Sequence, residues 1–172
     1  MEIDIPNCSI IHYPSKVLMC KAKPVAQIDQ QIRRLVERMA EVMIGLKGIG
    51  LAAPQVGVPL RLFIVSLDCT REHMKVFVNP TIQCFGPLQS QEEGCLSVPG
   101  IYTHIPRYAS CEVTATDLEG RQFTERAEGL YARCLQHEFD HIEGITIVQR
   151  MGCAGRIAHR RQLKRLEGQA DQ

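Results

Sequence analysis

The run QHEFDH at residues 136–141 constrains the fold more than any other segment. His137 and His141 are four residues apart, and on an α-helix this spacing places both imidazoles on one face, where they can bind one metal ion. Glu138 follows the first histidine, so its carboxylate can lie beside the ion without binding it and can accept a proton from water. The run therefore predicts a helix over about residues 130–141 that carries two ligands of a catalytic metal site. An amphipathic helix with two half-buried histidines is the alternative.

A catalytic site of this kind needs a third protein ligand and one open position. The extended metzincin pattern fails, because Ile147 lies where that pattern has its last histidine. Glu167 would be a thermolysin-like ligand, although it ends a basic segment with no supporting acid cluster. Cys95, in the run QEEGCLSVPG, is the stronger candidate, because a thiolate offsets part of the metal's charge and a Cys-His-His set leaves the fourth tetrahedral position to water. Residue chemistry alone does not decide between Cys95 and Glu167.

Two further segments have helical patterns. From Ile28 to Leu46 apolar residues recur every three or four positions and line one helix face. Asp29 can cap the start of this helix, and Gly45 or Gly48 can end it. Another helix is predicted from Gly155 to Glu167. Its apolar stripe is thin and consists of Ile157, Leu163 and Leu166.

The segments between the helices favour β-structure and turns. Four runs have strand composition, at residues 61–67, 75–79, 110–116 and 122–127. The last two can pair antiparallel across the turn Asp117–Gly120. Residues 48–57, which contain three glycines and a proline, predict a constrained loop. We therefore expect one α+β domain over residues 1–172, with short antiparallel strands around a central metal-binding helix and a helix towards each terminus.

The composition excludes several classes of protein. The 20 Lys and Arg nearly balance the 19 Asp and Glu, so the molecule as a whole has no polyanion-binding signature. The N-terminus lacks the apolar core of a signal peptide, and no stretch approaches the ~20 apolar residues of a membrane span, so we expect a cytoplasmic protein without a membrane partner. The eight cysteines are dispersed without a C-x-x-C pair, and we expect most of them to be reduced and buried.

Three segments resemble, in their order along the chain, the signature motifs of the peptide deformylases. They are GIGLAAPQ at residues 48–55, EGCLS at residues 93–97 and QHEFDH at residues 136–141. The resemblance covers most of the chain. It implies a metal-dependent hydrolase that removes the formyl group from N-formylmethionine at the start of nascent polypeptides and releases formate. It also implies one divalent ion, Fe2+ in preference to Zn2+, Ni2+ or Co2+, and no further cofactor.

The same resemblance implies a role for residues of each motif. The implied metal ligands are Cys95, His137 and His141. The implied catalytic groups are Glu138 as general acid and base, with Gln55 and the backbone N–H of Leu96 as oxyanion donors. The implied substrate contacts are Ile49, Gly50, Gly94, Leu130 and Cys134. Behind the site, Glu93 and Arg107 are expected to pair and to hold the Cys95 segment in place.

Two rival functions remain open at this point. A zinc aminopeptidase or endopeptidase built on the same helix would cleave unformylated peptides. A catalytically silent relative would bind nascent chains or use zinc only for structure. Against the silent relative, a structural zinc site is normally closed by four protein ligands and has no use for Glu138.

The C-terminal segment is basic. Its charged positions, with no acid among them, are Arg156, Arg160, Arg161, Lys164 and Arg165. A solvated helix face is the ordinary interpretation. The functional hypothesis is that this face holds the enzyme to ribosomal RNA near the emerging chain, with an affinity that falls steeply with salt.

Overall fold

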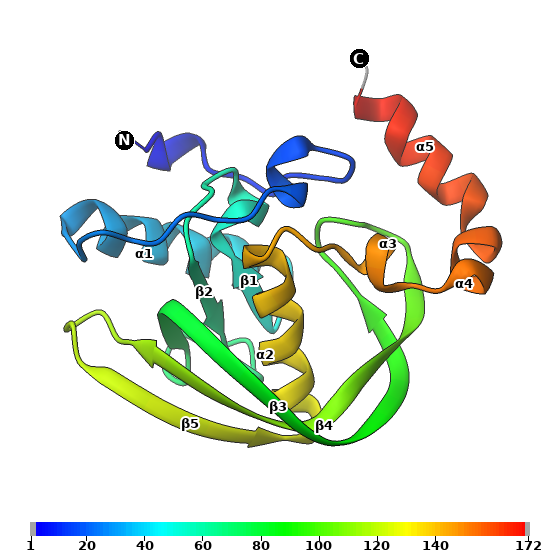
Figure 1. Cartoon of the computed structure of the whole chain (residues 1–172). Coiled ribbons are helices and arrows are strands. Elements are labelled where there is room, and N and C mark those ends of the chain that lie inside the picture. The colour runs from blue at the N-terminus through cyan, green and yellow to red at the C-terminus, as the bar shows by residue number, and fades with distance from the viewer. Residues whose placement is uncertain (1–2, 171–172) are drawn as a thin grey trace.

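Helix α2 (Gly129–Ile142) lies at the centre of the molecule and confirms the predicted helix (Figure 1). The computed structural model describes residues 3–170, so residues 1–2 and 171–172 of the predicted domain lie outside the described residues. The chain leaves α2 at Gly144, where φ is 77° and a Cβ atom would lie 2.7 Å from the backbone carbon of Cys20. Glycine alone fits this left-handed backbone and close approach, so the helix ends directly after its second histidine.

Five antiparallel strands form one sheet in the order β1-β2-β3-β4-β5. They are β1 (Gly50–Ala52), β2 (Leu62–Val65), β3 (Lys75–Gly94), β4 (Tyr102–Thr116) and β5 (Gln122–Glu128). The predicted hairpin is confirmed, because Thr116 pairs with Gln122 and Ser110 with Glu128. Figure 1 shows β3 and β4 as long ribbons that curve past α2. The α+β class is thus confirmed.

The expectation of uniformly short strands is wrong for β3 and β4, which have 20 and 15 residues. The predicted run ended at Asn79, just before a proline. In the structure the register shifts between Val78 and Thr81, and this irregularity accommodates Pro80 within the strand. The added length matters for function, because the far end of β3 delivers Glu93 and Gly94 to the side of α2.

Strand β2 is buried on both faces. Leu62 and Ile64 of β2 belong to the apolar cluster that includes α1 (Gln30–Gly45), whereas Phe63 and Val65 belong to the cluster that includes α2. The run LFIV is therefore continuously apolar rather than alternating. Helix α1 begins as predicted, since the Asp29 side chain accepts a hydrogen bond from the Ile32 N–H at 3.0 Å.

The glycine-rich segment at residues 48–57 is more regular than predicted. It contains β1 and the short 3₁₀ helix η3 (Ala53–Val56), so the expectation of a constrained loop without regular elements is wrong. Gly57, at φ 83°, ends η3. Two other 3₁₀ turns, η1 (Ile5–Asn7) and η2 (Lys16–Met19), precede α1.

The predicted helix at residues 155–167 is divided. The chain forms α3 (Ile147–Arg150), α4 (Cys153–Ala158) and α5 (Arg160–Ala170), and Figure 1 shows α5 extending away from the strands. Leu163 and Leu166 pack in an apolar cluster with Val98 and Ile101, but Ile157 is 75% exposed and does not belong to it. The break therefore separates the short, exposed helix α4 from α5, which packs beside the segment that follows Cys95.

All eight cysteines are free, but only Cys8, Cys111 and Cys134 are buried, so the expectation that most are buried is wrong. Within residues 3–170, the helices are all too short or too polar to cross a membrane.

Candidate metal centre and active site

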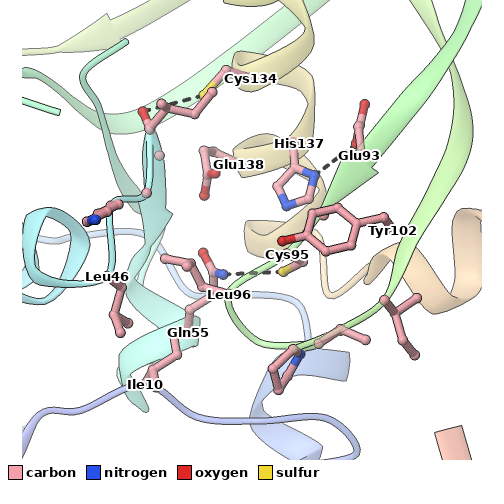
Figure 2. Close-up of a pocket in the computed structure, with 18 of the residues that line it drawn as sticks. Ile10, Leu46, Gln55, Glu93, Cys95, Leu96, Tyr102, Cys134, His137 and Glu138 are labelled. Atoms are coloured by element: carbon pink, nitrogen blue, oxygen red, sulfur yellow. Dashed lines mark hydrogen bonds and ion pairs between the residues drawn. The ribbon is translucent and has the colours of Figure 1, made fainter. Parts of the chain in front are cut away.

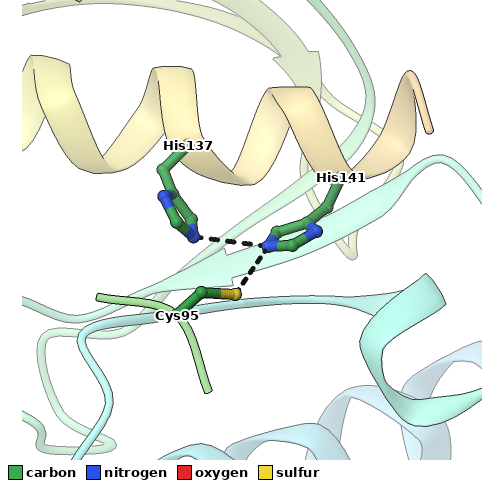
Figure 3. A group of neighbouring side chains, drawn as sticks. All are labelled: Cys95, His137 and His141. Carbon is green, nitrogen blue, oxygen red and sulfur yellow. Dashed lines mark hydrogen bonds between the residues drawn. The ribbon is translucent and has the colours of Figure 1, made fainter. Parts of the chain in front are cut away.

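Cys95, His137 and His141 converge although the cysteine is 46 residues from the second histidine (Figure 3). Cys95 follows the last residue of β3, and both histidines project from α2. The Nε2 atom of His141 lies 3.3 Å from the Cys95 Sγ and 3.3 Å from the Nε2 of His137. Glu167 is not part of this cluster, and its carboxylate instead interacts with the Tyr13 hydroxyl.

The chemistry of this donor set fits a divalent transition-metal ion. The three ligand atoms lie within 4.8 Å of one another. One thiolate and two imidazoles are ligands that Zn2+ and neighbouring ions accept. Within the described residues no fourth histidine, cysteine or carboxylate joins the three, which is the arrangement of a catalytic rather than a structural site.

Glu138 lies beside the three donors and has the environment of a proton acceptor. Its side chain is buried, and its Oε2 atom has no hydrogen-bond partner among the described residues. Burial raises the pKa of the Glu138 carboxyl to about 7. Such a carboxyl can accept a proton near neutral pH and release it again.

Gln55 and Leu96 both line the cavity next to Cys95 (Figure 2). Gln55, on η3, is buried, and its Nε2 atom lies 3.6 Å from the Cys95 Sγ and 3.3 Å from the Ser97 Oγ. The backbone N–H of Leu96 donates no hydrogen bond within residues 3–170. An amide N–H and a backbone N–H beside the metal donors can both meet an oxyanion.

A cavity of about 550 Å³ opens onto this centre. The five predicted substrate contacts all line it, namely Ile49, Gly50, Gly94, Leu130 and Cys134. Its outer rim carries exposed apolar side chains, among them Leu46, Tyr102 and Leu130. Figure 2 shows Tyr102 beside Cys95, and Cys134 next to Glu138. The lining thus combines the polar groups of the metal centre with apolar side chains.

Glu93 and Arg107 form the expected pair. The Arg107 Nε and Nη2 atoms donate to the two Glu93 carboxylate oxygens at 2.6 and 3.0 Å, and both side chains are almost fully buried. Glu93 also accepts from the His137 Nδ1 at 3.0 Å, which leaves the His137 Nε2 facing Cys95 and His141. Burial acts to raise the pKa of Glu93, but the hydrogen bonds from His137 and Arg107 outweigh it and lower the pKa to about 2.

Three residues of this ionic network, Asp140, Arg150 and Arg133, were not predicted from the sequence. Asp140 accepts hydrogen bonds from Arg107 at 2.8 Å and from Arg150, and Arg133 donates to Glu93 at 2.6 Å. Asp140 lies inside the motif QHEFDH, and Arg133 precedes His137 by one helical turn, so their helix positions were signals available in the sequence. Their partners on β3 and β4 could not be predicted, because they depend on how the two curved strands pair.

Helix α2 bears two imidazoles and a buried carboxyl, and other segments bring the Cys95 thiol and the Gln55 amide to them. Together with the α+β fold, this centre defines the protein as a metal-dependent hydrolase. Comparison with known proteins identifies the family within this class. The family model of the polypeptide deformylases matches residues 7–156. The chain belongs to this family, which confirms the family resemblance, the hydrolase class and the metal dependence expected from the sequence.

Individual relatives agree with the family assignment. The peptide deformylase of Neisseria gonorrhoeae is 46% identical over 143 residues, which cover 83% of this chain and 86% of the relative. That of Chromobacterium violaceum is 40% identical over 161 residues, covering 94% of this chain and 96% of the relative. The crystal structure of a peptide deformylase from Legionella pneumophila has a TM-score of 0.87 at 37% identity and covers 95% of this chain and 97% of its own.

Proposed function

We propose that this chain removes the formyl group from N-formylmethionine at the start of nascent polypeptides, with Cys95, His137 and His141 as ligands of one divalent metal ion. The observation that carries this proposal is the convergence of one Sγ and two Nε2 atoms within 4.8 Å beside a buried carboxyl. When bound, such an ion supplies Lewis acidity, which makes hydroxide available at neutral pH and polarises a carbonyl group.

Glu138 is the proposed general base and acid. It accepts the proton of the attacking water and later delivers it to the amine that departs from the formyl carbon. Support comes from its burial beside the proposed ligands and from its Oε2 atom, which has no hydrogen-bond partner among the described residues.

Gln55 and Leu96 are the proposed donors to the oxyanion. Negative charge gathers on the formyl oxygen as its carbon becomes tetrahedral, and the Gln55 Nε2 and the Leu96 N–H can donate to it. One such donor typically contributes about a hundredfold to a thousandfold in rate. The Gln55 Nε2 lies 3.6 Å from the Cys95 Sγ, so it acts beside the metal ligands.

The cavity walls are the proposed methionine pocket. Ile49, Leu130 and Cys134 would contact the thioether side chain, and Gly50 and Gly94 would pair with the substrate backbone as an added strand does. At Gly50 a Cβ atom would lie 2.9 Å from the Cys134 Sγ, so glycine keeps this wall open.

Fe2+ is the ion that we propose, with Zn2+, Ni2+ and Co2+ as ions that the same ligands accept. The ligand set alone does not choose among them. The cytoplasm is the proposed compartment, because Cys95 must remain a free thiolate to bind the ion and all eight cysteines are free thiols. The ribosome is the proposed partner of the exposed basic residues between Arg156 and Arg165.

Paired assays on formylated and unformylated peptides test the function. The proposal predicts formate release from formyl-Met peptides and no cleavage of the same peptides without the formyl group. An aminopeptidase or endopeptidase would show the opposite preference. A silent relative would cleave neither peptide, and either result would contradict the proposal.

A further inference from the structure

Arg133 lines the cavity and also makes four hydrogen bonds to the β3–β4 hairpin. Its guanidinium donates to the Glu93 Oε1 at 2.6 Å, the Gln89 carbonyl at 2.7 Å, the Ile105 carbonyl at 2.9 Å and the Gln91 Oε1 at 3.1 Å. The first, second and fourth partners belong to β3, and the third to β4. Its side chain is only 8% exposed, so these bonds are shielded from water. One arginine of α2 thus binds the closing end of the β3–β4 hairpin.

The Glu93 carboxylate has all of its acceptor positions filled. Oε1 accepts from Arg107 and from Arg133, each at 2.6 Å. Oε2 accepts from Arg107 and from the His137 Nδ1, each at 3.0 Å. A carboxylate offers about four such positions, so the His137 ring has one place to donate and one orientation in which to do so.

Among the contacts that hold α2 to the hairpin, those of Arg133 and Asp140 lie about one turn to either side of His137. Arg133 lies one turn before His137 and binds main-chain carbonyls of both strands. Asp140 lies about one turn after His137 and binds Arg107 of β4 at 2.8 Å. Arg133 thus binds both the Gln89 carbonyl of β3 and the side chain of Glu93, two residues before Cys95.

We propose that Arg133 is a positioning residue for the metal centre. It sets the distance between Cys95 and the two histidines and the orientation of the His137 ring, without touching the ion or the substrate's formyl group. This inference rests on the proposed ligand assignment. Groups that orient metal ligands typically change metal affinity by about 10–100-fold when they are removed, which is the effect expected here.

The test compares metal affinity in matched variants. Arg133→Met removes all four hydrogen bonds but keeps the apolar stem, and Arg133→Lys keeps the charge but not the fork of donors. The control is Arg61→Met, because Arg61 is also shielded but binds Glu143 and the Pro80 carbonyl and not Glu93. Zn2+ affinity is measured by competition with a chromogenic chelator, and the thiolate absorption of the Co2+ form is recorded.

We expect Arg133→Met to bind Zn2+ at least about tenfold more weakly and to shift the Co2+ thiolate band, with Arg133→Lys between it and the unaltered protein. Arg61→Met should lose thermal stability but keep both metal properties. Should Arg133→Met fail to fold, Arg133→Lys alone must still lose at least about threefold in affinity.

An Arg133→Met variant with unchanged Zn2+ affinity and Co2+ spectrum would overturn the inference while leaving the proposed function intact. Formate release is measured separately on the same preparations. Failure of the unaltered protein to release formate while it binds Zn2+ would contradict the function and not the role of Arg133.

Discussion

The Oε1 atom of Gln55 accepts a hydrogen bond from the backbone N–H of Ala52 at 2.8 Å. This bond fixes which end of the side-chain amide faces the metal ligands. With Oε1 held by the backbone, the Nε2 is directed to the Cys95 Sγ and the Ser97 Oγ. The short helix η3 thus orients an amide donor before any substrate arrives, which is the preorganisation that oxyanion stabilisation requires.

Gln55→Glu should lower kcat by about a hundredfold to a thousandfold with little change in KM. The new carboxylate can still accept from Ala52, but it presents an acceptor and a negative charge where the oxyanion forms. Steady-state formate release from a formyl-Met peptide measures both constants. A kcat within threefold of the unaltered enzyme would show that Gln55 is not an oxyanion donor.

Gly50→Ala should lower activity by about a hundredfold, because displacement of a catalytic group by about 1 Å has that effect. The added Cβ would lie 2.8 Å from the Glu138 Cδ and 2.9 Å from the Cys134 Sγ, so both side chains would have to move. The comparison is Gly45→Ala at the end of α1, where a Cβ meets nothing within 4 Å. Kinetics and thermal melts of the two variants should differ, with Gly45→Ala fully active. Equal activity in both would contradict the prediction.

Asp140→Ala should reduce the free energy of unfolding by about 3–5 kcal/mol. Arg107 is 4% exposed and would keep a buried charge with one of its two carboxylate partners gone. Glu41→Ala provides the comparison, because Glu41 is 52% exposed and its surface ion pairs should contribute at most about 1 kcal/mol. Urea denaturation of both variants gives the two values. Similar losses would mean that the buried network contributes little to stability.

Neutralising the basic C-terminal residues should abolish ribosome co-sedimentation at low salt and leave formate release from short peptides unchanged. The five positions, all exposed, are Arg156, Arg160, Arg161, Lys164 and Arg165. A control neutralises five exposed basic residues elsewhere, at Lys16, Lys23, Arg34, Arg121 and Arg126. Co-sedimentation that survives in the first variant, or is lost equally in the second, would remove the proposed contact.

Local spacing explains why part of the site could be predicted. His137, Glu138 and His141 lie on one helix, so their relative positions follow from the helical repeat alone. Cys95 reaches them only because β3 continues past Pro80 through a register shift, and residue chemistry without the family resemblance left Glu167 open. The Arg133 contacts depend on the curvature of the same hairpin, which strand propensity does not encode.

The same limit explains the errors in the fold. The run predicted at residues 75–79 ended before Pro80, whereas register shifts let β3 continue to Gly94. The C-terminal helix was predicted from a stripe that included Ile157, and packing of Leu163 and Leu166 near Val98 breaks that stripe. Tertiary contacts, rather than local preference, decided both outcomes.

The most direct test measures metal content and formate release on the same anaerobically purified sample, for the unaltered protein, Cys95→Ala and Glu138→Ala. The Sγ of Cys95 lies 3.3 Å from the His141 Nε2, so removing it should lose the ion and the activity together. Glu138→Ala should keep one ion per chain and lose nearly all turnover. A Cys95→Ala protein that retains both its ion and its activity, or a fully active Glu138→Ala protein, would contradict the account.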